Sequence, residues 1–434
     1  MAHDTFEEVA IPVRRFEGFP KPALLLCVGL VVVGAAAFIA ALVTDAERAW
    51  RAYLFNWLYF GSMAEGAVML AVAVILARGL WARPVRRIAL GFVAFLPIWY
   101  VLLFPLLFQG EAIFHWYHEE LHGAKAAYLD IPFLVTRNIV LLAALVALSL
   151  AFAYWALRPD AGALRDEAPS WLKPLYARLS RGWRGQEAEE ELAYRRLLVL
   201  GPVLALTWAL ALSVVAFDFV QSQDPHWFST LIGPYFFMAG FLGGLAATIV
   251  FTVVYRSRLG LDEVIRAPQF HDLGKLLFAF CIFWAYLFWA QFIVIWYGML
   301  PWEQSFLVER LGPPYDGIAT LILFLIFVAP FFGLLGAAPK RTPPVLALFA
   351  SLVLLGLWFE RYILVYPSFY GGAETLPLGW QEVGTALAFA GLLIGAAVWF
   401  ATRFPVVQLW QPAAEEALML STEEPPGTEA VTIE

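Results

Sequence analysis

The chain has 434 residues, of which 62% are hydrophobic and 15% are charged. Soluble domains have about 45–50% apolar and about 25% charged residues, so this composition indicates an integral membrane protein. It excludes a disordered chain, a secreted disulfide scaffold and a nucleic-acid-binding protein, because the net charge is −7 rather than basic. The segment 411–434 holds six Glu and no Lys or Arg, so most of the negative charge belongs to the tail.

Ten apolar runs of about 20 residues predict ten transmembrane helices, because that length spans the hydrocarbon core of a bilayer. They cover 23–43, 52–77, 86–108, 131–157, 196–220, 229–255, 274–298, 316–337, 345–366 and 380–402. The predicted fold is therefore all-α, with a membrane domain over 23–403 between an N-terminal segment, 1–22, and an acidic tail, 404–434. The many Trp and Phe suit lipid-facing and packing surfaces.

Basic residues alternate strongly between successive loops. One set of loops carries 22 Lys and Arg and the other carries five. The positive-inside rule then places both termini in the cytoplasm, and we expect a multi-pass membrane protein. The polar N-terminal segment lacks the features of a signal peptide, so we expect the first span to be retained.

The long loop 158–195 is predicted to contain a cytoplasmic amphipathic helix. Trp171, Leu172, Leu175 and Leu179 recur at helical spacing there, which is typical of a helix lying in the membrane interface. A faint repeat also relates 59–79 to 235–260. Both copies run in the same direction, which predicts two parallel four-helix units, spans 2–5 and 6–9.

Ionisable residues within spans are costly, at least about 2.5 kcal/mol each, so each is a functional candidate. Glu65 lies near the middle of the second span and stands alone. It is either a proton-relay station or a protonated group that donates one hydrogen bond, and we favour the relay.

A second group is predicted near the outer surface. Arg137, Asp218 and Glu360, with Arg361, lie within about two turns of that surface, near the loop that holds Asp224 and His226. Such a cluster could take protons from a buried substrate and pass them outward. The competing interpretation is that Arg137 pairs with Asp218 or Glu360 only to fasten the bundle.

Two further groups have both a functional and a structural interpretation. His271, Asp272 and Lys275 could form a cytoplasmic proton entrance, although capping of the seventh span is the simpler role for Asp272. His115, His118 and His122 are spaced three and four apart, which would place them on one face of a short helix and allow a metal site. No second ligand-bearing segment accompanies them, so an interfacial aromatic belt is favoured.

Only two cysteines exist, Cys27 and Cys281, and neither a CxxCH motif nor a four-Cys set is present. The chain therefore offers no covalent haem site and no iron–sulfur site of its own. If it takes part in redox chemistry, we expect the redox centres to belong to partner proteins.

Several segments together resemble a known family. The most specific are Ser222–Thr230 (SQDPHWFST) and His271–Phe280 (HDLGKLLFAF), joined by Leu54–Gly61, Phe95–Pro97, Leu103–Phe108, Tyr128–Phe133 and the aromatic run Phe283–Tyr297. Over about residues 50–370 they resemble the polysulfide-reductase membrane-subunit (NrfD-like) family, and within it the F subunit (ActF) of bacterial alternative complex III.

The resemblance implies a ten-helix membrane protein with two four-helix bundles and two peripheral helices, in a respiratory quinol:cytochrome c (electron acceptor) oxidoreductase. The implied partners are the related quinol-binding ActC protein, the iron–sulfur ActB protein and proteins that carry haem c, with an associated terminal oxidase. The implied substrate is menaquinol or ubiquinol.

We predict that this chain contributes a proton path and a scaffold. The path would run from His271, Asp272 and Lys275 through Glu65 and leave through Asp218 and Asp224. The resemblance also allows a quinol pocket near the periplasmic face, with Arg137, Asp218, His226 and Glu360. Two other functions stay open: a stand-alone proton-coupled transporter using Glu65 and Asp218, and an inert assembly protein. Co-purification with haem and iron–sulfur proteins would separate these hypotheses.

Overall fold

The computed structural model describes residues 12–411, and all regular secondary structure within them is helical. Ten helices or helix chains are long and apolar enough to cross a membrane, as predicted, and each overlaps its predicted span. The predicted acidic tail from residue 412 onward and the first eleven residues lie outside the described part of the chain.

Eight of the ten spans contain one long helix each. These are α1 (Lys21–Thr44), α2 (Ala46–Leu76), α8 (Ile131–Ala163), α10 (Gln186–Phe219), α11 (Ile232–Leu259), α12 (Ala267–Gly298), α17 (Pro343–Val365) and α18 (Trp380–Arg403). Short 3₁₀ turns extend two of them, η3 (Gln221–Gln223) after α10 and η5 (Tyr366–Ser368) after α17.

Spans 3 and 8 are interrupted helices. Span 3 consists of η1 (Leu80–Ala82), α3 (Arg83–Leu90), η2 (Gly91–Phe95), α4 (Leu96–Val101) and α5 (Leu103–Leu107). Span 8 consists of α14 (Asp316–Leu323), a π-helical turn, η4 (Phe324–Val328), and α15 (Ala329–Gly333). Pro97 and Pro330 each follow one of the irregular turns. A proline ring clashes with the carbonyl group four residues earlier and removes one backbone hydrogen bond, so the turn before each proline is not a regular α-helix.

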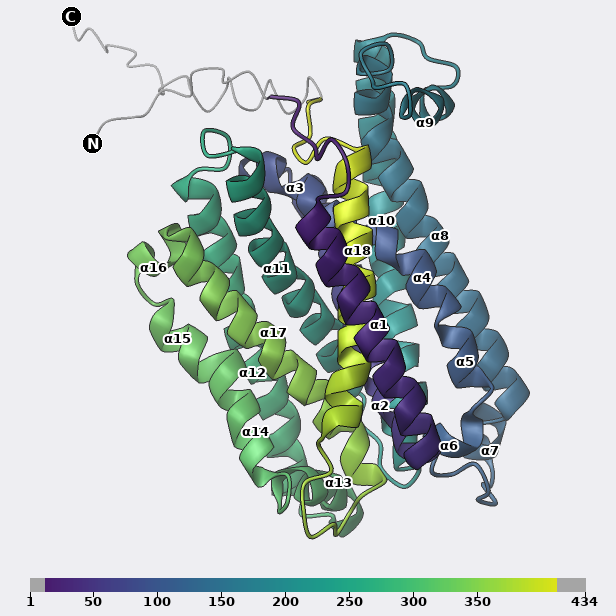
Figure 1. Cartoon of the computed structure of the whole chain (residues 1–434). Coiled ribbons are helices and arrows are strands. Elements are labelled where there is room, and N and C mark those ends of the chain that lie inside the picture. Colours follow the sequence, from purple (N-terminus) through teal and green to yellow (C-terminus); the bar gives the residue numbers. More distant parts are fainter. Residues whose placement is uncertain (1–11, 412–434) are drawn as a thin grey trace, which may run out of the picture.

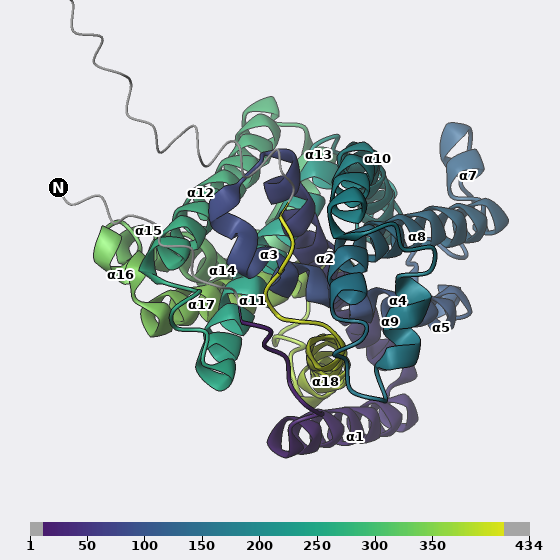
Figure 2. The ribbon, with the colours of Figure 1, turned by 90° about the horizontal axis from the view of Figure 1, so that it is seen from above.

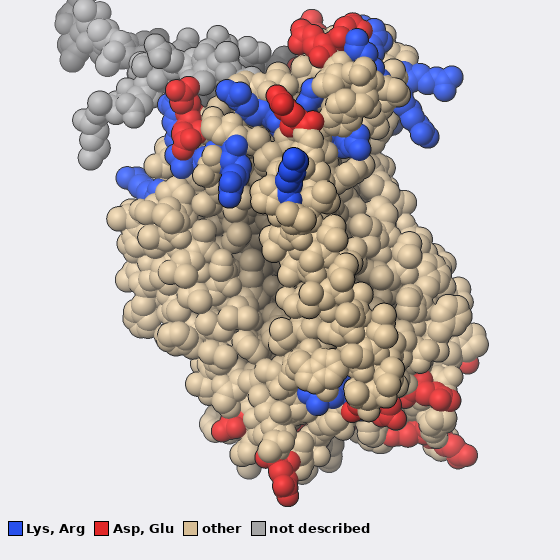
Figure 3. All heavy atoms as spheres, viewed as in Figure 1, with Lys and Arg blue, Asp and Glu red and all other residues tan. Residues whose placement is uncertain are grey.

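Short helices lie at the two ends of the bundle. At one end are α6 (Gly110–Ile113), α7 (Ala124–Tyr128) and α13 (Pro301–Leu311); at the other are α3, α9 (Lys173–Leu179) and α16 (Ala337–Arg341) (Figure 1). Most of the visible Lys and Arg gather at the second end, and the band between the two ends shows almost no charge on this face (Figure 3). We call these the acidic end (α6, α7, α13) and the basic end (α3, α9, α16).

The second span forms the centre of the molecule. Nearly every residue from Ala52 to Ile75 is buried, and α2 lies near the middle of the helices in Figure 2, whereas α1 lies at the margin beside α18. Small residues let α11 approach α2 closely. A Cβ added to Gly66 would lie 2.1 Å from the Gly240 carbonyl oxygen, and one added to Gly244 would lie 2.0 Å from the Ala67 nitrogen. This small-xxx-small contact is a common way to pack helices in a membrane.

The loop predicted over 158–195 is shorter than expected, because α8 and α10 extend into it. The amphipathic helix within it is only the seven residues of α9, and its apolar side is covered by protein: Leu172 and Tyr176 are fully buried. The Tyr176 hydroxyl donates to the Arg403 carbonyl oxygen at 2.8 Å. Of the predicted apolar residues, Leu172 thus packs against protein whereas Trp171 is 43% exposed, and the location of the helix in the membrane interface stays a prediction.

Candidate functional site

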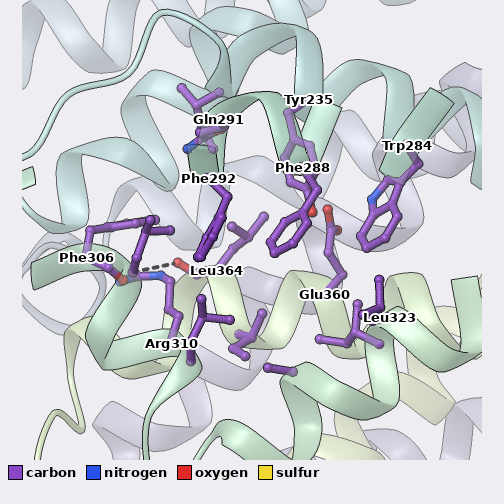
Figure 4. A pocket seen from close by; sticks show the side chains of 16 residues that line it. Tyr235, Trp284, Phe288, Gln291, Phe292, Phe306, Arg310, Leu323, Glu360 and Leu364 are labelled. Carbon is purple, nitrogen blue, oxygen red and sulfur yellow. Dashed lines mark hydrogen bonds between the residues drawn. The ribbon is translucent and has the colours of Figure 1, made fainter. Parts of the chain in front are cut away.

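A cavity opens between the second-half helices near the acidic end. Residues of α11, α12, α13, α14 and α17 line it, and it encloses about 690 Å³ including its open side. Its walls are mainly aromatic and aliphatic, and Figure 4 shows the rings of Phe288, Phe292 and Phe306 around it. Leu323 of α14 is 39% exposed and Gln291 of α12 is half-buried, so the cavity is only partly enclosed by its lining residues.

Glu360 brings a buried carboxyl group to this apolar cavity. Its side chain is 2% exposed, and Oε2 pairs with Nη1 of Arg361 at 2.6 Å. Arg361 is anchored in turn by a 2.8 Å bond from Nη2 to the Phe236 carbonyl oxygen. The other oxygen, Oε1, has no hydrogen-bond partner among the described residues. A buried acceptor without a partner is costly, so it marks a position where a ligand donor would be stabilised.

Two polar aromatic side chains flank this carboxyl. Tyr235 of α11 and Trp284 of α12 lie beside Glu360 (Figure 4). The indole N–H of Trp284 makes no hydrogen bond of good geometry within the described residues. Both side chains lie close enough to interact with the Glu360 carboxyl group, so the three residues form one polar cluster in a mainly apolar cavity wall, the usual composition of a small-molecule site.

Arg310 closes the cavity on the side of the acidic end. Its guanidinium donates to the Phe306 carbonyl oxygen at 3.0 Å, to the Leu364 carbonyl oxygen at 3.2 Å and to the Ser368 hydroxyl at 2.6 Å. It also lies 3.3 Å from the centroid of the Phe306 ring. Burial lowers the pKa of Arg310 to about 9, which leaves the group charged at neutral pH. These contacts hold α13 across one side of the cavity, and we call α13 in this position the cap.

The SQDPHWFST segment contributes to this cap through its tryptophan. Trp227 is buried and stacks on Phe306 with the ring centroids 3.6 Å apart. His226 is exposed, and its backbone N–H donates to the Asp224 carboxylate at 3.1 Å. Sequence reasoning selected the histidine for its chemistry and missed Trp227 and Arg310, because neither lies in a predicted span.

The predicted outer cluster is divided between two places. Arg137 of α8 and Asp218 of α10 form a two-pronged ion pair at 2.5 and 2.8 Å, and Asn138 adds a 2.5 Å bond to the same carboxylate. Glu360 instead lies on α17 and pairs with its neighbour. Of the four residues predicted for a quinol pocket, only Glu360 lines the cavity. Glu360 thus pairs separately from Arg137 and Asp218, and the fastening role considered for Arg137 and Asp218 matches the observed pair.

Glu65 is fully buried on the central helix. The Ser149 hydroxyl of α8 donates to its Oε2 at 3.2 Å, whereas Oε1 has no partner within residues 12–411. The Ser149 hydroxyl is thus the hydrogen-bond partner of one of the two carboxyl oxygens of Glu65. This arrangement suits a group that exchanges a proton, because the second oxygen is free to bond to another carrier.

His271, Asp272 and Lys275 lie at the beginning of α12 and are at least partly exposed. Because α12 begins at Ala267, Asp272 lies in its second turn and pairs with Lys275 at 2.5 Å. The prediction that Asp272 caps the helix is therefore wrong: the apolar run from Leu273 onward locates the hydrophobic segment, whereas the helix itself starts earlier, at Ala267-Pro268.

His115, His118 and His122 do not share one helical face. Residues 115–118 form turns, and the nearest carboxylates are Glu119 at 3.7 Å from His115 and Glu111 at 3.9 Å from His118. No group of three metal-ligating side chains occurs among the described residues. The expected short helix is wrong because Gly110–Ile113 ends before this segment and the chain turns there.

Two buried ion pairs at the basic end were not predicted from the sequence. Arg87 of α3 pairs with Asp160 of α8 at 2.7 Å, and Arg158 of α8 pairs with Glu189 of α10 at 2.6 Å. Arg87 lies at the very beginning of the predicted span 86–108, and the other three residues lie in the predicted loop 158–195, because α8 and α10 continue beyond their predicted spans. The sequence signal for such pairs is an Arg near the end of one predicted span together with an Asp or Glu near the same end of another span.

Comparison with known proteins adds no identification. No protein-family model matches the chain, and no curated protein is significantly similar to it. The fold and the sites therefore define the class, a multi-pass helical membrane protein with a partly open cavity, and the function is argued from their chemistry.

Proposed function

We propose that this chain is a cofactor-free membrane component of a respiratory quinol:cytochrome c (electron acceptor) oxidoreductase of the alternative complex III type. In this proposal it belongs to the NrfD-like family and provides a scaffold, a proton path and a quinol pocket. The observation that supports it most is the aromatic cavity with the buried carboxyl group of Glu360 in its wall.

A lipophilic quinol fits the chemistry of this cavity. Its isoprenoid chain dissolves in the bilayer and would enter the partly open cavity between α12 and α14. Its ring offers two hydroxyl groups, which suit an acceptor such as Glu360 Oε1 and a donor such as the Trp284 indole. Glu360 would accept a proton as the quinol is oxidised, and haem c and iron–sulfur clusters of partner proteins would take the electrons.

The released proton would leave toward the acidic end. Asp224 and Glu309 both act electrostatically on Arg310, which lines the cavity, and Glu309 lies 3.8 Å from its guanidinium. Asp224, one of the predicted exit residues, therefore suits this role, whereas Asp218 is held by Arg137. Glu65 would serve a separate path through the central helix.

The architecture and location form part of the same proposal. Spans 2–5 and 6–9 would be the two four-helix bundles, with α1 and α18 peripheral. The positive-inside rule would place the basic end and both termini in the cytoplasm of a bacterium. The proposed partners are the ActB and ActC proteins, the proteins that carry haem c and a terminal oxidase, besides membrane lipids.

The test is quinol:acceptor turnover by the purified complex carrying Glu360→Gln. Gln keeps the shape but cannot accept the proton, so turnover should fall about a hundredfold, the usual contribution of a general base. The control is Glu382→Gln, which alters another buried carboxyl group at the acidic end, bonded to Arg48 at 2.7 Å and remote from the cavity lining. Equal turnover in Glu360→Gln and the native complex would contradict the proposal.

A stand-alone proton-coupled transporter is the second candidate, and one observation favours it. The two interrupted spans, 3 and 8, hold the same position in the two halves of five spans, and transporters often have interrupted helices in matched positions. Mild detergent extraction separates the candidates. A member of the respiratory complex is isolated together with haem c and iron–sulfur proteins, and so is an inert assembly protein, whereas a transporter is isolated alone.

A further inference from the structure

A small cavity at the basic end has two buried polar groups without partners. It lies between α3, α11, α18 and the segment after α18, and Arg87 and Tyr255 both line it. Nε and Nη1 of Arg87 and the hydroxyl of Tyr255 make no hydrogen bond within the described residues. Arg87 is 1% exposed and Tyr255 is 4% exposed. The cavity has room for about one water molecule, and two or more polar partners are what such a water requires.

The direction of the Arg87 guanidinium is fixed by its remaining contacts. Nη2 donates to the Asp160 carboxylate at 2.7 Å and to the Ala156 carbonyl oxygen at 3.0 Å. Asp160 is held from its other side by the backbone N–H of Trp410 at 3.2 Å. These contacts therefore use only Nη2 of the guanidinium and leave Nε and Nη1, which point to different sides, without partners among the described residues.

Buried hydroxyl-bearing residues follow α11 from this cavity toward the centre of the membrane domain. Thr248, Thr252 and Tyr255 recur at spacings of four and three along α11, so they lie on one face of the helix. At a rise of about 1.5 Å per residue the row extends about 10 Å. One turn beyond Thr248 is Gly244, which touches α2 at Gly66, the residue after Glu65.

Local bonding explains part of this row. Each threonine hydroxyl donates to the carbonyl oxygen four residues earlier, at 2.7 Å, which is usual for threonine in membrane helices. That role leaves their oxygen lone pairs available as acceptors. It does not explain the unpartnered hydroxyl of Tyr255 or the unpartnered Nε and Nη1 of Arg87, which burial would otherwise penalise.

We propose that the Arg87–Tyr255 cavity is a water-binding site and that it forms, with the hydroxyl row of α11, the proton connection between Glu65 and the basic end. Each hydroxyl or water in such a chain accepts one proton and donates another, so no atom is gained or lost. The connection rests on the proposed relay role of Glu65 but is independent of the quinol cavity. It places the basic-end entrance at Arg87 and Asp160 rather than at His271, Asp272 and Lys275.

The test is the rate at which the carboxyl proton of Glu65 exchanges with D₂O, measured on the full-length protein in lipid nanodiscs by infrared spectroscopy. The C=O stretch of its acid form is assigned by its loss in Glu65→Gln. Tyr255→Phe removes one oxygen from the chain and should slow exchange about tenfold, which corresponds to about 1.4 kcal/mol. Ala401→Val fills the same cavity without removing a hydroxyl group and should slow exchange similarly.

The matched control is Tyr362→Phe. Tyr362 is also buried and its hydroxyl also lacks a partner among the described residues, but it lies on α17 near the acidic end. Exchange as fast in Tyr255→Phe and Ala401→Val as in the native protein would overturn the proposal, and so would equal slowing by Tyr362→Phe. The exchange rate does not depend on quinol turnover, so failure of the quinol proposal would leave this result intact, and the reverse also holds.

Discussion

The contact between α2 and α11 yields a prediction that two adjacent glycines can test. A Cβ at Gly244 would lie 2.0 Å from the Ala67 nitrogen and 2.3 Å from the Gly66 carbonyl carbon. These are backbone atoms of a central helix and cannot rotate away, so the helices must separate to restore an ordinary contact. At Gly243 a Cβ would meet the Leu357 side chain at 3.4 Å, which is already an ordinary contact.

The magnitude follows from the difference between the two positions. Alanine is favoured over glycine within a helix by about 1 kcal/mol at either site. Overpacking costs about 1–3 kcal/mol, and the rigid backbone contact places Gly244→Ala at the upper end, so we expect it to lower the free energy of unfolding by about 3 kcal/mol relative to Gly243→Ala. The assay is reversible unfolding in mixed micelles with increasing SDS. Equal stability of the two variants would refute the close contact between the helices.

Two further predictions concern buried contacts. Arg158→Met breaks a buried ion pair that is only 7% exposed on the arginine side and should destabilise the protein by about 3–5 kcal/mol, because the carboxylate is left unpaired. Arg195→Met, which breaks a pair whose arginine is 75% exposed, should cost less than about 1 kcal/mol; equal losses in SDS unfolding would contradict this. Trp227→Ala should cost about 3–5 kcal/mol through its stacking on Phe306, whereas the exposed Trp302→Ala should have little effect. Limited proteolysis near α13 checks that pair, and resistance equal to the native protein in Trp227→Ala would argue against the cap.

The sequence predicted the spans well because insertion depends on local hydropathy. Each of the ten apolar runs became a helix or a chain of helices, and none needed tertiary information. Helix ends were less predictable. α8 and α10 continue beyond their apolar runs because Arg158 and Glu189 pair with each other there, which makes the charges compatible with a buried helix end.

The sites needed the tertiary structure. Glu65 and Glu360 were found from the sequence, because a carboxyl group within an apolar run is conspicuous by itself. The partners of Glu360 were not, since Tyr235 and Trp284 resemble every other aromatic residue of a membrane helix until α11, α12 and α17 are brought together. Arg87 and Asp160 were missed for the same reason. They form an ion pair although 73 residues separate them in the sequence, and only the folded structure brings them together.

Photoaffinity labelling with an azidoquinone tests the central proposal most directly. The purified protein in lipid nanodiscs is irradiated with the probe, and the labelled peptides are identified by mass spectrometry with and without excess unlabelled quinone. We predict labels on α12, α14 and α17, around Phe288, Leu323 and Glu360, that excess quinone removes. Labels confined to α1 or to the surface of α8, or labels that excess quinone does not reduce, would contradict a quinol site in this cavity.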